Sequence, residues 1–98
     1  TAALDDLVQA LLSAQTPDQM RALLGDLCTP AELEALSDRW QVVPLLLASV
    51  PYRDIYDRTG VSVTTIGRVA RCLLQGTGGY LHAAESLGLQ RHPDSSSD

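Results

Sequence analysis

The sequence predicts a small all-α domain of six helices that contains a helix-turn-helix unit. Apolar residues make up 45% of the 98-residue chain, with no Phe and one Trp, so burial depends on Leu, Val and Ala. These residues recur at helical spacing, and two segments begin with the same Thr-Pro capping pattern. In addition, a tight turn that contains glycine joins two of the predicted helices.

The first two predicted helices are amphipathic. In the first, apolar residues recur at i, i+3, i+4, i+7 and i+8 and form one stripe: Leu4, Leu7, Val8, Leu11 and Leu12. Residues 16–19, Thr-Pro-Asp-Gln, then combine a hydroxyl N-cap, a proline at the first helical position and a Gln three residues after the cap. The second helix follows, with these side chains inward: Met20, Leu23, Leu24 and Leu27.

The third predicted helix is the longest and is expected to be the central one. Residues 29–32, Thr-Pro-Ala-Glu, repeat the capping box, and apolar residues continue at helical spacing behind it: Leu33, Leu36, Trp40, Val43 and Leu47. Pro44 lacks an amide donor and clashes with the carbonyl four residues back. We therefore expect a kink or an early end of the helix near Pro44.

The remaining elements are bounded by glycines. A short helix from about Pro51 to Arg58 is followed by a turn in which Gly60 can adopt the left-handed conformation and Ser62 can cap the next helix. That fifth helix, residues 63–75, is expected to stop at Gly76. A last short helix runs from 78–79 to Leu87, and the polar residues 90–98 are expected to form a disordered tail, so residues 1–89 make one domain.

Composition argues against several classes of protein. No apolar run is long enough to span a membrane and no secretion signal opens the chain, so we expect a cytoplasmic protein that does not contact a membrane. Cys28 and Cys72 stand alone, and apart from Glu85 neither His82 nor His92 has a candidate ligand partner on the same face, which argues against a metal site or a cofactor. An enzyme would need a nucleophile such as Cys72 with His82, but no elbow or oxyanion motif accompanies them. We therefore predict a protein that is not an enzyme.

Charge is unevenly distributed along the chain. The net charge of −5 argues against a nucleic-acid partner, because arginine and lysine provide most of the attraction to phosphates. Residues 1–36, however, hold six acids against one Arg, whereas residues 51–75 hold two Asp against four Arg. The basic segment therefore coincides with the predicted helix-turn-helix.

The fifth helix has two different faces. At 100° per residue, one side holds Ile66, Ala70 and Leu73, and the opposite side holds Thr64, Gly67, Arg68, Arg71 and Gln75. Arginine can bond guanine O6 and N7 with two hydrogen bonds, threonine can donate to phosphate or contact a thymine methyl, and a helix N-terminus attracts phosphate. These residue types favour binding of double-stranded DNA in the major groove.

From residue 27 to about residue 75 the sequence resembles the Trp repressor family. The matching segments are Cys-Thr-Pro-Ala-Glu-Leu-Glu-Ala-Leu-Ser-Asp-Arg, Tyr-Arg-Asp-Ile and Thr-Gly-Val-Ser-Val-Thr-Thr-Ile-Gly-Arg-Val. The resemblance implies an intertwined homodimer of six-helix subunits and a DNA-binding transcriptional regulator, expected to be a repressor. It places DNA contacts at Arg53, Thr64, Thr65 and Gly67, with Arg68 near the phosphates and the effector. From position on the helix we add Ser62 and Arg71 to the DNA-binding set.

The resemblance also implies a small-molecule effector pocket at Thr29, Arg39 and Arg68. Two positions depart from tryptophan-binding members, because Val69 stands where they have a glycine and Cys72 where they have a serine. The pocket is thus narrower and less polar, and we expect that any effector is not tryptophan. Arg39 has a second interpretation, a salt bridge to an acid at the dimer interface.

One alternative function remains open, a helical protein-protein interaction module without DNA binding. An acidic helical dimer with exposed apolar stripes could accept a partner helix in a groove. DNA binding should weaken steeply with salt, whereas binding in an apolar groove should not.

Overall fold

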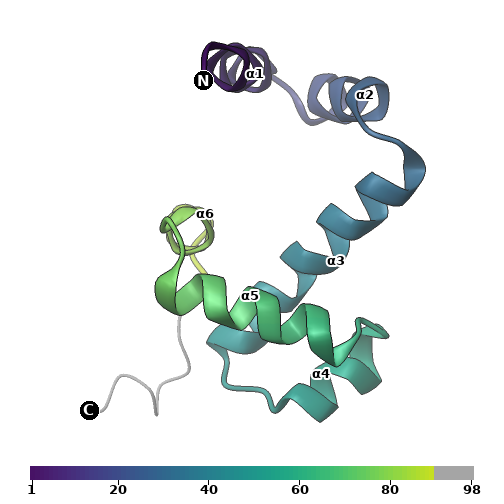
Figure 1. Ribbon diagram of the computed structural model, residues 1–98, viewed down its shortest axis with the longest axis vertical. Coiled ribbons are helices and arrows are strands. Elements are labelled where there is room, and N and C mark those ends of the chain that lie inside the picture. The colour runs from purple at the N-terminus through teal and green to yellow at the C-terminus, as the bar shows by residue number, and fades with distance from the viewer. Residues whose placement is uncertain (90–98) are drawn as a thin grey trace. The chain divides into compact units, whose positions relative to one another are not determined.

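The computed structural model describes residues 1–89, which form six α-helices and contain no strand (Figure 1). The described residues divide into two compact units, the first formed by residues 1–35 and the second beginning at Leu36. The predicted all-α class and the number of helices are therefore confirmed. The predicted disorder of residues 90–98 concerns a segment outside the described residues.

The first unit contains α1 (Ala2–Leu12), α2 (Pro17–Leu27) and the start of α3 (Pro30–Leu47). Hydroxyl groups cap each helix. Thr1 Oγ1 accepts from the amide of Leu4 at 3.2 Å, and Thr16 Oγ1 accepts from that of Gln19 at 3.1 Å. At the third helix the box is reciprocal, since the Thr29 amide donates to Glu32 Oε1 at 2.8 Å and the Glu32 amide donates to Thr29 Oγ1 at 3.1 Å. Both predicted Thr-Pro capping motifs therefore begin helices.

No residue of α1 or α2 is buried, although both helices carry the predicted apolar stripes. Leu4 and Leu12 of the first stripe are 56% and 71% exposed, and Leu27 of the second is half exposed. The apolar side chains of these two helices therefore have little cover within a single chain.

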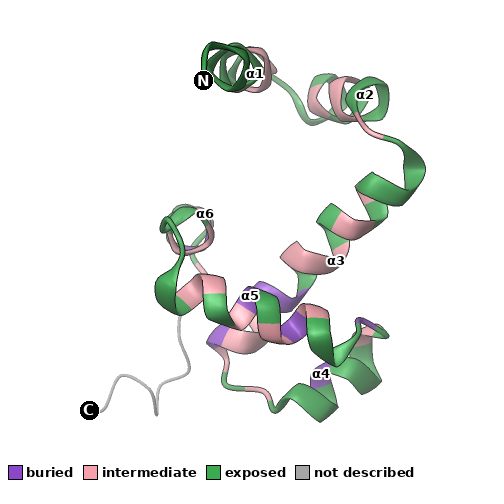
Figure 2. Cartoon of the chain, in the orientation of Figure 1, coloured by how far each residue is buried: buried purple, intermediate pink, exposed green. Residues whose placement is uncertain are grey.

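The hydrophobic core lies in the second unit (Figure 2). Buried side chains of the end of α3, of α4 (Tyr52–Thr59), of α5 (Val63–Gln75), of the turn between them and of α6 (Gly79–Ser86) form one cluster: Val42, Val43, Leu47, Ile55, Val61, Ile66, Val69 and Ala84. Helix α5 packs against both α4 and α6. The cluster fixes the two helices of the predicted helix-turn-helix against each other.

Pro44 lies inside α3, and the helix continues through it to Leu47. The amide of Ala48 still donates to the carbonyl oxygen of Pro44 at 3.0 Å. The helix therefore ends within one turn after the proline rather than at it. The other bounds agree closely with expectation: α5 spans the predicted residues, while α4 is shifted forward by one residue and α6 ends one residue earlier.

Candidate nucleic-acid interface

The turn between α4 and α5 is fixed by a short network of hydrogen bonds. Gly60 ends α4 with φ 75° and ψ 0°, and its amide donates to the carbonyl oxygen of Tyr56 at 2.8 Å. Thr59 Oγ1 donates to the Ile55 carbonyl at 2.7 Å and accepts from the Val61 amide at 3.1 Å. Left-handed backbone is accessible to glycine without steric cost, so the predicted conformation of Gly60 is confirmed. With Ile55 and Val61 buried, the turn sets the angle between α4 and α5.

Ser62 caps α5 as predicted and is joined to Thr65. The Thr65 amide donates to Ser62 Oγ at 3.1 Å, and the Ser62 hydroxyl lies 3.1 Å from Thr65 Oγ1. Both hydroxyls are therefore engaged within the first turn of the helix. Thr64, between them in sequence, is exposed and has no side-chain hydrogen bond among residues 1–89. Of the three hydroxyl side chains in the predicted DNA-binding set, Thr64 is the one whose hydroxyl makes no hydrogen bond within residues 1–89.

The outward face of α5 carries the polar side chains that the sequence pattern placed there. Thr64, Arg68, Arg71 and Gln75 are exposed, while Ile66 and Val69 on the opposite side are completely buried. Gly67 lies beside the polar row, and a Cβ added to it would meet no atom within 4 Å. Neither packing nor a left-handed backbone requires glycine here, so the bare backbone is available for close approach of another molecule.

Four arginines of α4 and α5 are exposed and have no ion-pair partner among residues 1–89: Arg53, Arg58, Arg68 and Arg71. Asp57 lies four residues after Arg53, and Asp54 four residues before Arg58, a spacing at which helical ion pairs form. The ion pair found in the described part of the chain is instead that of Arg21 with Asp18 in α2, at 2.9 Å. The helix-turn-helix therefore presents uncompensated guanidinium groups.

The residues predicted for an effector pocket are distributed over both units. Thr29 belongs to the first unit, where its hydroxyl serves the capping box of α3, and the other four belong to the second: Arg39, Arg68, Val69 and Cys72. Val69 is completely buried in the core, so its methyl groups pack inside the chain. Arg39 is half-buried and makes no ion pair within the described residues. The pocket and the interface salt bridge both stay predictions.

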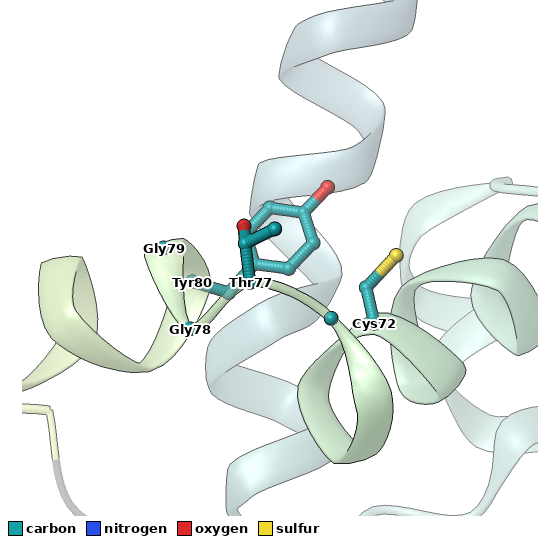
Figure 3. Close-up of a pocket in the computed structure, with 6 residues that line it drawn as sticks. Cys72, Thr77, Gly78, Gly79 and Tyr80 are labelled. Atoms are coloured by element: carbon teal, nitrogen blue, oxygen red, sulfur yellow. The ribbon is translucent and has the colours of Figure 1, made fainter.

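A cavity of about 380 Å³ lies beside the turn between α5 and α6 (Figure 3). Cys72 lines it together with the segment Gly76–Tyr80, and the Tyr80 ring also lies 6.3 Å from that of Trp40, tilted by 38°. Of the predicted effector residues it contains Cys72 alone. The sequence analysis did not anticipate this cavity, because it depends on how the turn brings Tyr80 back toward α3.

Metal binding and membrane insertion find no support in residues 1–89. In that part of the chain no three His, Cys, Asp or Glu side chains are grouped as a metal site requires. None of its helices combines the length and the apolar character needed to cross a membrane.

Comparison with known proteins identifies the family to which this chain belongs. The sequence model of the family described as Trp repressor protein matches residues 2–87, a range that includes all six helices in full. The chain belongs to the Trp repressor family. The resemblance seen in the central segment thus extends to the N-terminal helices and to α6. Membership supports DNA binding and transcription regulation, and members of this family are regulators rather than enzymes.

Three relatives are similar to this Trp repressor family protein over most of its length. The uncharacterized protein YerC of Bacillus subtilis is 36% identical over 84 residues, which cover 86% of this chain and 81% of YerC. A TrpR-like protein of Eubacterium eligens has a crystal structure with a TM-score of 0.87 at 38% identity, covering 93% of this chain and 94% of that one. A candidate Trp repressor of Staphylococcus aureus has a TM-score of 0.89 at 32% identity, covering 94% and 92%.

Proposed function

We propose that this protein is a sequence-specific DNA-binding transcriptional regulator that acts as a repressor. In this proposal α5, residues Val63–Gln75, lies in the major groove of double-stranded DNA and α4 crosses the phosphate backbone. Arg53, Thr64, Gly67, Arg68 and Arg71 contact the duplex, while Ser62 and Thr65 hold the first turn of α5 in shape.

The unpaired arginines of the helix-turn-helix are the observation that carries this proposal. Four exposed guanidinium groups lie on two adjacent helices, and the two aspartates of α4 form no ion pair with them. Residues 51–75 carry a net charge of +2 while the chain as a whole carries −5, so the rest of the protein carries −7. Such segregation attracts phosphates to one surface and repels them from the others, which orients the protein on DNA.

A homodimer is part of the proposal, because the first unit lacks a buried core of its own. The described residues bury eight apolar side chains, all between Val42 and Ala84, and α1 and α2 contribute none. A chain of this length buries a smaller fraction of its surface than a larger domain does, so a second copy is the natural cover for the two exposed stripes. Two copies would also place two α5 helices on successive major grooves.

Selection of bound sequences from a pool of random duplexes, followed by affinity measurement at several salt concentrations, tests this function. We expect a defined recognition sequence, and an affinity for it that falls steeply between 50 and 200 mM salt. Failure to enrich any sequence would contradict the proposal. Binding of a protein helix with little salt dependence, in place of DNA binding, would instead support the interaction-module alternative.

A further inference from the structure

We propose that Val63 determines part of the DNA sequence preference by contacting the 5-methyl group of a thymine. This inference rests on the proposed function, because it requires α5 to lie in the major groove. There the thymine methyl is the apolar group on the base edges, and an apolar protein side chain is its natural partner.

Val63 is the first residue of α5, and its side chain is 54% exposed. Gly67 follows one turn later on the same flank of the helix, since residues i and i+4 are neighbours. Nothing lies within 4 Å of the position where a Cβ of Gly67 would be, so the Val63 methyl groups do not fill that space. The two residues therefore leave an apolar side chain next to bare backbone, which a base edge can approach.

Local structure gives no reason for valine at this position. A β-branched side chain forms helix less readily than alanine, and an exposed first-turn residue gains little from packing. The cap of α5 is made by Ser62 and Thr65, so Val63 does not serve it. Val63 is therefore available to contact a molecule outside the chain.

The neighbours of Val63 match a base edge rather than an apolar protein surface. Thr64, next to it, is exposed with a free hydroxyl, and Arg71 lies on the same side one turn beyond Gly67 without an ion pair. A hydroxyl and a guanidinium beside one small apolar side chain correspond to the mixed polar and methyl pattern of the major groove. The side chain of Val63 would then distinguish thymine from bases that lack the methyl group.

Uracil in place of thymine tests this contact, because it removes the methyl group and keeps every Watson–Crick hydrogen bond. The recognition sequence selected with the full chain is prepared with each thymine replaced singly by uracil. Affinities are then measured for the natural protein, for Val63→Ala and for Leu74→Ala. Leu74 is an exposed aliphatic residue of the same helix, 84% exposed, but eleven residues later and about 16 Å further along the axis.

We expect one or more uracil substitutions to weaken binding of the natural protein about fourfold, the effect of losing one buried methyl group. Val63→Ala should bind the thymine and uracil duplexes equally, whereas Leu74→Ala should keep the natural ratio. Equal binding of all duplexes by the natural protein, or a ratio that persists in Val63→Ala, would overturn the inference and leave the proposed function intact. If no recognition sequence is obtained at all, both fail.

Discussion

Ser62 and Thr65 are joined twice at the start of α5, through the Thr65 amide and through their two hydroxyl groups, each at 3.1 Å. The pair satisfies one of the free amide donors of the first turn and orients the side chain of each residue. It thereby separates the residues that shape the helix from Thr64, whose hydroxyl is free to meet DNA.

This separation predicts different effects for two hydroxyl substitutions. Ser62→Ala should lower the free energy of unfolding by about 1 kcal/mol, because the cap is lost. Thr64→Ala should change it by less than about 0.5 kcal/mol while weakening binding to the selected duplex. Urea denaturation and fluorescence anisotropy measure the two quantities. A stable Ser62→Ala together with a destabilised Thr64→Ala would contradict the assignment.

Gly67 predicts opposite changes in stability and in DNA affinity. Gly67→Ala should raise the free energy of unfolding by up to about 1 kcal/mol, because alanine forms helix better and its Cβ meets no atom of the chain. The same methyl group should weaken DNA binding by about 1 to 3 kcal/mol if the backbone approaches the duplex closely.

Gly60→Ala provides the matched control for this prediction. With φ at 75°, Gly60 has a backbone that alanine adopts at a cost of about 1 to 2 kcal/mol, so this variant should be less stable. Gly67→Ala with unchanged DNA affinity would show that α5 does not approach the bases as closely as proposed.

Much of the fold could be predicted from local signals. The ends of α5 follow from the Ser62 cap and from Gly76, where a Cβ would lie 2.5 Å from the carbonyl oxygen of Cys72. The arginine face of α5 follows from helical periodicity in the same way. These features depend on neighbours within one or two turns, which the sequence displays directly.

The remaining features of the site depend on tertiary packing. The cavity beside α6 is lined in part by Tyr80, whose ring lies near that of Trp40, forty residues earlier. The hydrogen bond between the hydroxyl groups of Ser62 and Thr65 could not be predicted from their spacing alone. The sequence did offer one indication for Val63, since it is an apolar residue one helical turn before Gly67. The division of α5 into an apolar and a polar face, however, assigned Val63 to neither face.

The proposed dimer predicts that an acidic residue on the apolar stripe of α1 weakens dimerisation more than an acidic residue on the opposite face of the helix. Leu7→Glu should dissociate the dimer, because Leu7 lies on the stripe and is 37% exposed in the single chain. Gln9→Glu adds the same charge about 200° away on the helix and should leave assembly unchanged. Sedimentation velocity at micromolar concentration measures both. A compact, stable monomer of the natural chain would contradict the proposed dimer.

Tryptophan is not expected to act as a corepressor. Tryptophan-binding members of the family have a glycine where this chain has Val69 and a serine where it has Cys72. A larger side chain in a tight binding site costs about 1 to 3 kcal/mol of binding free energy. Calorimetry with millimolar tryptophan, alone and with the selected duplex, should show no saturable binding. Micromolar binding that tightens the DNA complex would show that the pocket accommodates the indole despite Val69.

The central claim, that the outward face of α5 binds DNA, is tested most directly by one arginine and its control. Arg68→Ala should weaken binding to the selected duplex by about 1 to 3 kcal/mol without changing the unfolding curve. Arg21→Ala removes the same charge from α2, where the side chain is 75% exposed and paired with Asp18, and should bind as the natural protein does. Equal affinity of Arg68→Ala and Arg21→Ala at physiological salt would contradict the claim.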